Sequence, residues 1–552
     1  MKIARILSLM AFTFSGLTAA TPPSTPSKRE WACDASPYAV DMFNAAIAWN
    51  DAFWDDRAGY LIAASSNPGR YDTRHTAWYA TQLLARGQGD DVERAIRIFD
   101  NVIAGQYLDP SKQWYGDYQQ APSEPEPGSS EYPDIEPYST WDPNIRDFVG
   151  CAWIVALNDY GHLLPATTIA KVEQSLHTAA RGDLYRVGGV DGDNLYPCYS
   201  NPWLMRTILH AWVGARMNDQ NISHAAETFA QEAYDLWSQH RTLSEFNSPT
   251  YAGVSMWALA LWNQYAPEGS LLKKYGAEML TATWNDLAEL YNANLKNLAG
   301  PWDRSYGYNM QEYVSLIGAV IWGTVGRGYA PFPRQTSGMY HQDDFAFYPL
   351  FALAMPEMVK YLSAEAKAAL VKFPGEHMVS VQAYSPPVDT YPRNVTTWMS
   401  ENITIGAETV AEKVIGGPAK NPGAFNPAVI QWAIDEYLVG SLTLYPTQSS
   451  IHAVAAPGRL TISYRNATAT AADGPIAFQF LFSGLDVRNG GYNVTGLEGL
   501  PDLKLKVTTN AMQNYTITYD TSQEVSQFVF YNITYTMPAE FTGDPFISLD
   551  VL

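Results

Sequence analysis

The chain has 552 residues, of which 47% are apolar, 13% aromatic and 16% charged, a composition typical of a folded protein with two or three domains. Its formal net charge of −21 argues against nucleic-acid binding, which requires a basic surface, and would repel a polyanionic ligand unless basic residues gather at the site. The 17 Trp and 35 Tyr residues suit a sugar-binding protein, because sugar C–H faces stack on rings, and equally suit a large aromatic core.

The N-terminal segment resembles a secretory signal peptide over residues 1–20. Lys2 and Arg5 precede an apolar stretch, 6–14, and a small-residue cleavage site follows. Residues 21–36 form a linker or propeptide. No other run of about twenty apolar residues could anchor the chain in a membrane. We therefore expect a secreted, extracellular protein with neither a membrane nor a nucleic-acid partner.

The sequons support this expectation, whereas the cysteines leave their pairing open. Three cysteines, Cys33, Cys151 and Cys198, permit one disulfide and one free thiol in a pairing that the sequence leaves open. No Cys/His spacing indicates a metal site, and we expect no cofactor. Seven Asn-x-Ser/Thr sequons predict glycosylation at Asn221, Asn394, Asn402, Asn466, Asn493, Asn514 and Asn532.

Residues 37–375 alternate apolar and amphipathic segments with helical spacing. Six clusters of polar and aromatic residues each open an apolar helix, and in most cases an amphipathic helix follows. Such helices pack in two layers. The apolar segments span about 71–86, 141–157, 199–217, 245–265, 302–324 and 340–355, and their amphipathic partners about 90–107, 166–181, 222–240, 269–291 and 363–372.

Closure of these layers into a ring would give an (α/α)-toroid of five to six helical hairpins. The N-termini of the inner helices would then gather at one end, where their polar clusters and positive dipole ends face a common cavity. An open superhelical stack is the alternative arrangement, and we favour closure. Residues 108–140 form a long loop without periodicity, which is either functional or a plain surface excursion.

The sequence pattern of residues 376–552 predicts a second domain, an antiparallel β-sandwich. Short segments rich in Val, Ile, Thr, Tyr and Phe are separated by Gly, Asn and Pro. One helix-like stretch, 427–438, interrupts them. The predicted strands lie at 378–383, 442–445, 460–464, 476–482, 503–507, 515–519 and 528–535. We expect this domain to support the toroid or to help bind substrate.

The cluster that opens the segment 245–265 places a carboxylate, an amide and a phenol close together: Glu245, Asn247 and Tyr251. A polar cluster at the start of a helix too apolar to face water indicates a buried helix whose first turn meets a cavity. A capped core helix without chemistry is the alternative reading.

An aromatic-rich helical toroid followed by a β-sandwich resembles the toroid polysaccharide lyases, including the heparinase II/III-like group and the alginate and hyaluronate lyases. The resemblance is one of architecture, and the Asn–Asn–His triplet typical of several such lyases is absent. It implies an Asn or Arg that neutralises a uronate carboxylate and a Tyr or His that serves as base and acid. Residues of these types stand in the clusters at Asn201, Asn247, Arg304, Tyr306, Tyr308, His75 and His341.

A lyase removes the weakly acidic proton beside the uronate carboxylate, which must first be neutralised. We expect Arg304 and Asn247 to neutralise it. Tyr306 or Tyr308 would serve as base and acid, with a histidine as the alternative base. The candidate catalytic residues are Asn247, Tyr308, Tyr306, Arg304, Glu245, His75 and His341, and the candidate substrate-binding residues are Asn201, Trp203, Tyr251, Trp302, Trp78, Trp141 and Asp303.

A glycoside hydrolase would instead need two carboxylates across the scissile bond. Asp142, Glu245, Asp303 and Asp344 are its candidates, although Asp142 and Asp303 also suit helix caps. A small-molecule dehydratase or cyclase and a non-catalytic glycan-binding protein remain further alternatives, because one fold hosts many functions. We expect a polysaccharide lyase that acts on a uronate-containing glycan.

Overall fold

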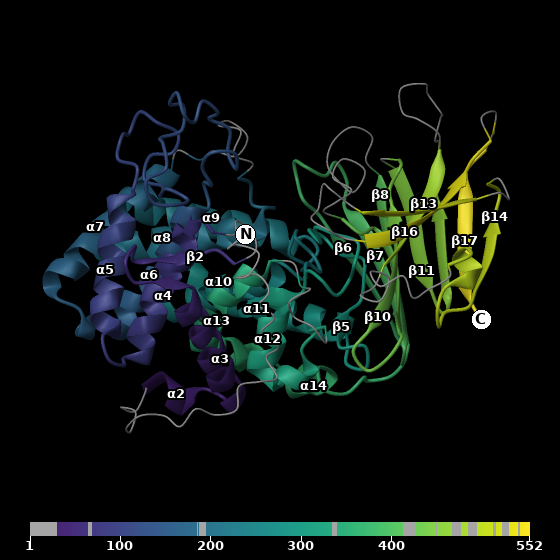
Figure 1. Ribbon diagram of the computed structural model, residues 1–552, viewed down its shortest axis with the longest axis horizontal. Helices are drawn as coiled ribbons and strands as arrows, with labels where there is room; N and C mark the ends of the chain where they lie inside the picture. The colour runs from purple at the N-terminus through teal and green to yellow at the C-terminus, as the bar shows by residue number, and fades with distance from the viewer. Residues whose placement is uncertain are drawn as a thin grey trace, which may run out of the picture.

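The protein consists of a helical part and a β part that lie side by side (Figure 1). The helices fall between Glu30 and Ala369, and the large sheet begins at His377. The computed structural model describes residues 30–64, 69–184, 186, 195–333, 339, 341–411, 425–448, 450–465, 476–483, 494–511, 515–521, 529–538, 541 and 543–552. The expected signal peptide, 1–20, and most of the linker 21–36 lie outside these residues.

The helical part contains a series of paired α-helices. In chain order they are α2 (Glu30–Asp34), α3 (Pro37–Phe53), α4 (Thr73–Arg86), α5 (Asp91–Ala104), α6 (Ile145–Tyr160), α7 (Ala166–Asp183), α8 (Ser200–Met217), α9 (Gln220–Ser238), α10 (Ala252–Tyr265), α11 (Leu271–Leu290), α12 (Ser315–Val325), α13 (Tyr348–Met358) and α14 (Ala364–Ala369). Short 3₁₀ helices cover Gly161–Leu163, Arg327–Tyr329, Gln342–Phe347, Val359–Tyr361 and Leu497–Gly499.

Burial separates these helices into an inner and an outer layer. The inner helix α10 buries every residue from Gly253 to Asn263, whereas the outer helix α9 buries one stripe that includes Ile222, Ala226 and Ala230. Four inner helices pack on the outer helix that follows them: α4 on α5, α6 on α7, α8 on α9 and α10 on α11. The sequence pattern of apolar and amphipathic segments therefore predicts the two layers correctly.

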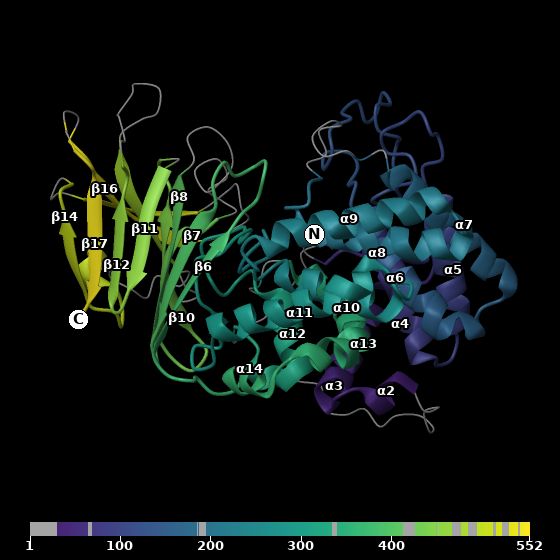
Figure 2. The ribbon, with the colours of Figure 1, turned by 180° about the vertical axis from the view of Figure 1, so that it is seen from behind.

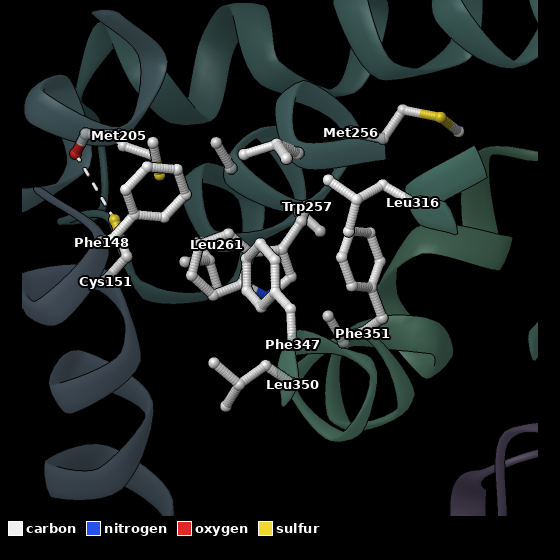
Figure 3. Packing of buried hydrophobic residues seen from close by; sticks show 14 of the residues in the cluster. Phe148, Cys151, Met205, Met256, Trp257, Leu261, Leu316, Phe347, Leu350 and Phe351 are labelled. Atoms are coloured by element: carbon white, nitrogen blue, oxygen red, sulfur yellow. Dashed lines mark hydrogen bonds between the residues drawn. The ribbon is translucent and has the colours of Figure 1, made fainter. Parts of the chain in front are cut away.

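The inner layer closes on itself. Helix α4 packs on α6, α6 on α8, and α8 on α10; α10 packs on α12 and α13, and α13 packs on α3 and α4 (Figures 1 and 2). The centre of this ring is filled by apolar side chains (Figure 3). Phe347 stacks on Trp78 with ring centroids 4.3 Å apart and meets the edge of Trp257 at 4.8 Å. The closed (α/α)-toroid is confirmed, with a packed core below its cavity.

Within its described residues, the β part contains twelve antiparallel strands that share one folded sheet. Their bounds are β6 (His377–Ala383), β7 (Arg393–Met399), β8 (Ile403–Ala411), β9 (Ala428–Ala433), β10 (Val439–Tyr445), β11 (Ser450–Ala456), β12 (Arg459–Ser463), β13 (Ala477–Ser483), β14 (Leu505–Thr509), β15 (Thr516–Thr521), β16 (Val529–Thr536) and β17 (Phe546–Val551). Short strands in the helical part are β1 (Trp54–Asp55), β2 (Tyr60–Ile62), β3 (Tyr71–Asp72), β4 (Tyr291–Asn292) and β5 (Asn297–Leu298).

The strand order β14-β17-β12-β11-β8-β9-β10-β13-β16-β15, with β7 and β6 added beside β8, folds the sheet over an apolar interior. In β11, buried and half-buried residues alternate, as expected for a strand with one face in the core. The predicted β-sandwich is thus confirmed. The expected helix-like stretch 427–438 is wrong, because Ala428–Ala433 forms strand β9, paired with both β8 and β10.

The two parts meet along β7, β8 and β9. Gln431 donates to the Leu298 carbonyl at 2.9 Å, and Thr397 donates to the Gly300 carbonyl at 2.9 Å. Gly406 is required here, since a Cβ at this position would lie 1.8 Å from the Gly300 carbonyl oxygen. The β part therefore supports the loop that follows Gly300, which enters the cavity described next.

Three further sequence expectations concern cysteines, sequons and membranes. Cys33 is exposed, Cys151 and Cys198 are buried, and these three described cysteines form no disulfide. No helix in the described part of the chain is long and apolar enough to cross a bilayer. Asn221, Asn394 and Asn402 are exposed and Asn532 is half-buried, whereas Asn466, Asn493 and Asn514 lie outside the residues whose surroundings are described.

Candidate active site

A cavity of about 320 Å³ opens where the inner helices begin. Helices α4, α6, α8 and α10 each contribute from their first turn or from the residues just before it, and the loop before α12 completes the wall. The predicted gathering of polar clusters at one end of the ring therefore occurs. The cavity is lined by Arg74, Tyr138, Asp142, Asn144, Phe148, Tyr199, Asn201, Tyr251, Arg304 and Tyr306.

Arg304 and Tyr306 form a close pair in this wall. The Nε and Nη2 atoms of Arg304 both donate to the phenolic oxygen of Tyr306, with Nε 2.7 Å away. Both residues adopt positive φ angles, +54° and +52°, which is uncommon outside glycine and found where surrounding structure holds a functional loop. The Oη atom of Tyr251 lies 3.3 Å from that of Tyr306.

Burial and charge act in opposite directions on these phenols. Burial raises the pKa of Tyr306 above its ordinary value, while the charge of Arg304 and the hydrogen bonds from Tyr251 and Arg304 lower it. Burial and the neighbouring Tyr306 raise the pKa of Tyr251 further, well above its ordinary value. The pKa of both phenols is raised, and Tyr306, which is opposed by the Arg304 charge and two hydrogen bonds, is the more readily ionised of the two.

Glu245 lies behind the wall and holds two lining residues. Its Oε2 atom accepts from the backbone N–H of Asn201 at 3.0 Å and from the side-chain amide of Asn201 at 2.9 Å. Its Oε1 atom accepts from Nη1 of Arg304 at 3.4 Å. Burial raises the pKa of Glu245, and Arg304 and Asn201 oppose that shift. Glu245 thus acts on the cavity through Arg304 and Asn201.

Arg74 is the second cation of the cavity and is differently placed. Its guanidinium lies 5.0 Å from the ring centre of Phe148 and 5.5 Å from that of Trp78, and 3.9 Å from the Asp142 carboxylate. Among the described residues it makes no hydrogen bond, so its planar set of donors remains available to a ligand.

Asn144 is fixed between aromatic and basic neighbours. Its side-chain amide donates to the hydroxyls of Tyr138 and Tyr199, each at 3.3 Å, and its Oδ1 atom accepts from buried Arg186 at 3.0 Å. Tyr138 belongs to the long loop 108–140, so this loop contributes to the cavity wall. Tyr199 also faces Arg304, whose guanidinium lies 5.0 Å from its ring centre.

Asn247 and Tyr308, which were predicted to be catalytic, do not line the cavity. Asn247 donates both amide protons to backbone carbonyls, of Ala299 at 2.7 Å and of Pro301 at 2.6 Å, so it braces a loop and cannot neutralise a carboxylate. Tyr308 is buried against Leu481 and Phe530 of the β part. Both assignments are therefore corrected to structural roles.

The two predicted histidines also lie outside the lining. His75 is buried against Trp78, its Nδ1 atom lies 3.5 Å from Asp72, and burial lowers its pKa. His341 packs on Tyr313 with ring centroids 4.8 Å apart, and burial lowers its pKa to about 4. Neither imidazole lines the cavity, so the alternative of a histidine base is not supported by their positions.

Of the predicted substrate-binding residues, Asn201 and Tyr251 line the cavity and the others do not. The four tryptophans are core residues, because their indole N–H groups donate to backbone carbonyls inside the fold. Asp303 pairs with Arg393 of β7 at 3.3 Å. The indole of Trp78 donates to the Phe148 carbonyl, that of Trp141 to Ile135, that of Trp203 to Phe229, and that of Trp302 to Leu298. These four tryptophans and Asp303 therefore have structural roles.

Five lining residues were not predicted, although each lies in or next to a polar-aromatic cluster or the long loop: Arg74, Tyr138, Asn144, Phe148 and Tyr199. Their position in the sequence could have identified them, since each of the clusters stands at the start of an inner helix. In the part of the chain described, no group of three or more His, Cys, Asp or Glu side chains is arranged to hold a metal ion.

Comparison with known proteins identifies family models but no curated relative. A model described as "Domain of unknown function (DUF8769)" matches residues 40–356, and one described as "Domain of unknown function (DUF8770)" matches residues 375–552. No curated protein matches the chain. The two matches divide the chain between the helical part and the β part.

Three solved structures align with most of this chain at low similarity. "Heparinase III-BT4657 gene product" aligns at a TM-score of 0.34 and 8% identity over 98% of this chain and 87% of that chain. The heparan sulfate lyase HepC from Pedobacter heparinus aligns at 0.23 and 9% over 93% and 88%. The endoglucanase CelQ from Clostridium thermocellum, complexed with cellotriose, aligns at 0.26 and 11% over 93% and 92%. Alignments with scores this low support no conclusion about this chain and assign no residue a role.

Proposed function

The chain belongs to the family described as "Domain of unknown function (DUF8769)", and we propose that it is a secreted polysaccharide lyase that cleaves a uronate-containing glycan by β-elimination. The observation that carries the proposal is the pair of hydrogen bonds from Arg304 to the single phenolic oxygen of Tyr306, inside an aromatic cavity. A guanidinium in this position stabilises the phenolate, which is the form of tyrosine that accepts a proton.

The second requirement is a group that binds the uronate carboxylate. Arg304 is committed to Tyr306 and Glu245 through all three of its nitrogens, so it is poorly placed to hold a substrate anion as well. Arg74 makes no such hydrogen bonds to the described residues and stands in the same cavity. In our proposal Arg74 binds the carboxylate and stabilises the enolate-like charge that develops on it.

The third requirement is a proton for the leaving oxygen, and Tyr251 supplies it. Tyr306 takes the proton from the carbon beside the carboxylate, the C–O bond to the leaving sugar breaks, and a C=C bond forms. Tyr251 donates its proton to the leaving oxygen. The 3.3 Å contact between the two hydroxyls then lets Tyr306 pass its new proton to Tyr251, which leaves Tyr306 as the base again.

The hydrolase alternative finds less support in the positions of the carboxylates. Among the described residues that line the cavity, Asp142 is the one carboxylate. Glu245 is bound by Arg304 and Asn201 behind the wall, and Asp303 is bound by Arg393. A pair of carboxylates facing each other across a bound sugar is the arrangement that hydrolysis requires.

The reaction class is tested by incubating the purified protein with a panel of acidic and neutral polysaccharides. β-Elimination creates an unsaturated uronate whose conjugated double bond absorbs in the ultraviolet, and hydrolysis does not. We expect ultraviolet absorbance to rise when the substrate is an acidic glycan and to stay constant when it is a neutral one. New reducing ends without absorbance would replace the proposal with hydrolysis, and binding without any product would replace it with a glycan-binding role.

A further inference from the structure

A buried arginine of the β part, Arg393 at the start of β7, contacts the helical part and is 2% exposed. Its Nε atom donates to Asp389 at 2.8 Å and its Nη1 atom to Glu408 of β8 at 2.8 Å. Its Nη2 atom donates to the Ser244 carbonyl at 2.9 Å and to Asp303 at 3.3 Å. Arg393 therefore joins two β-part carboxylates to two separate segments of the helical part.

Those two segments are the ones that carry the central residues of the cavity. Ser244 precedes Glu245, and Asp303 precedes Arg304, so the two partners of Nη2 in the helical part are each one residue away from the Glu245–Arg304 ion pair. The ion pair spans 59 residues of sequence, and neither segment is part of a helix or strand. One guanidinium thus fixes the backbone on both sides of this pair.

Further hydrogen bonds join the segment before Glu245 to the β part near the end of β6. The Ser244 hydroxyl donates to the Tyr384 carbonyl at 2.6 Å, and the Ser385 hydroxyl donates to the Ser244 carbonyl at 3.3 Å. Thr242 donates to the Gln382 carbonyl at 2.6 Å. The segment before Glu245 is therefore held by the residues at the end of β6 and just after it.

The charges around Arg393 are unusual for a purely stabilising contact. One guanidinium faces three buried carboxylates, those of Asp303, Asp389 and Glu408. Burial raises the pKa of Asp303 to about 7 and also raises that of Glu408, and neighbouring carboxylates add to both shifts while Arg393 opposes them. A buried ion cluster is weak evidence of net stability, and in some proteins such a cluster fixes geometry.

We propose that Arg393 is a positioning residue of the active site. It acts through the Ser244 carbonyl and Asp303 to hold Glu245 and Arg304 at the spacing at which Arg304 meets Tyr306. The β part then completes the catalytic site of the helical part. This inference rests on the proposed function only where enzyme activity is the readout.

The test compares Arg393→Met, Arg393→Lys and Asp303→Asn with the control Arg459→Met. Arg459 forms an exposed ion pair with Asp550 between β12 and β17 of the β part. Amide hydrogen exchange is measured by mass spectrometry on the full chain, with attention to residues 242–247 and 302–309. Turnover and KM are measured on the glycan that the unmodified protein cleaves, and the pH dependence of exchange is followed in parallel.

We expect Arg393→Met to accelerate exchange in both segments while the strands β10, β13 and β16 remain protected. It should lower kcat by about a hundredfold, as small displacements of catalytic groups do, with little change in KM. Arg393→Lys should restore part of the protection, because it keeps the charge and loses the fork of donors. Asp303→Asn should accelerate exchange in 302–309 alone, and Arg459→Met should change neither segment.

Unchanged exchange in both segments of Arg393→Met would overturn the inference. So would exchange that rises equally throughout the β part, since Arg393 would then be a general stabilising residue. If Arg393→Met does not fold, amide exchange of residues 242–247 and 302–309 in Arg393→Lys and Asp303→Asn decides the question. If no glycan is cleaved by the unmodified protein, the proposed function fails while the exchange measurements still test the positioning role.

Discussion

The phenolic oxygen of Tyr306 receives hydrogen bonds from two nitrogens of Arg304, two residues earlier in the chain. Both residues have positive φ angles, a backbone conformation that persists only where the surrounding structure maintains it. Glu245 then fixes the third nitrogen of Arg304 from behind. The result is a phenol whose anion is stabilised by a guanidinium that is itself held in place, and this pair is the chemical centre of the proposed lyase.

The pH dependence of activity follows from this pair. Tyr306 must lose its proton to act as a base, and burial raises its pKa above the ordinary value of 10.0. We therefore expect kcat/KM to increase with pH from neutral into the alkaline range. In Arg304→Met the rise should move to higher pH, because the charge that lowers the pKa of Tyr306 is removed. A rise at the same pH in both proteins would contradict this role of Arg304.

Arg74 should determine affinity for the substrate anion. A hydrogen-bonded contact with a charged group contributes about 1.5–3 kcal/mol, so Arg74→Met should raise KM by roughly 10- to 100-fold. The same variant should bind a carboxyl-reduced glycan as the unmodified protein does, because that ligand lacks the anion. Arg94→Met is the control, since Arg94 forms its ion pair with Asp90 on the outer helix α5. Equal losses of affinity for the acidic and the carboxyl-reduced glycan would show that Arg74 only maintains the structure of the cavity wall.

Glu245 should be necessary for stability as well as for activity. In Glu245→Gln, an amide N–H replaces an acceptor in a buried site that already receives three donors. Unsatisfied buried groups cost about 1–3 kcal/mol, and the free energy of unfolding in urea should fall by that amount. Glu278→Gln, at an exposed pair with Arg241, should change it by less than about 0.5 kcal/mol. Equal losses in the two variants would exclude this role of Glu245.

Asp303 should make the stability of the fold depend on pH. Its pKa rises from 3.8 to about 7, chiefly through burial and through Glu245 and Glu408, against the opposing charges of Arg393 and Arg304. A carboxyl whose pKa is raised by folding favours the folded state while it is protonated. That contribution is complete below about pH 4 and is lost as the pH rises through about 7.

Asp303→Asn should remove this part of the pH dependence, because the amide does not titrate. Urea unfolding at several pH values between about 4 and 8 measures it. We expect the unmodified protein to lose more stability than the variant across this interval. Parallel curves for the two proteins would show that Asp303 titrates normally.

The sequence predicts the architecture well because burial leaves a strong periodic signal. The inner helices α4, α6, α8, α10, α12 and α13 all follow a cluster of polar and aromatic residues and consist of apolar runs. The failure at 427–438 has a physical cause: strand β9 is buried on both faces, and a short continuous apolar run does not distinguish a strand from a helix.

The site was predicted less completely, because a cluster fixes where residues lie and not where their side chains point. Asn247 and Arg304 stand in similar clusters, and both have positive φ angles. Yet Asn247 turns to the carbonyls of Ala299 and Pro301, whereas Arg304 turns to Tyr306. The tryptophans were misassigned for a related reason, since each lies deep enough for its indole to reach a buried carbonyl.

Whether Tyr306 is the catalytic base is decided by comparing Tyr306→Phe with Tyr308→Phe on the glycan that the unmodified protein cleaves. Each change removes one hydroxyl, from the cavity in the first case and from the contact with the β part in the second. Formation of unsaturated uronate is followed by ultraviolet absorbance. We predict that Tyr306→Phe lowers kcat by about 10²–10⁴-fold, as expected for loss of a general base, and that Tyr308→Phe leaves it nearly unchanged. Near-normal turnover by Tyr306→Phe would contradict the proposed mechanism.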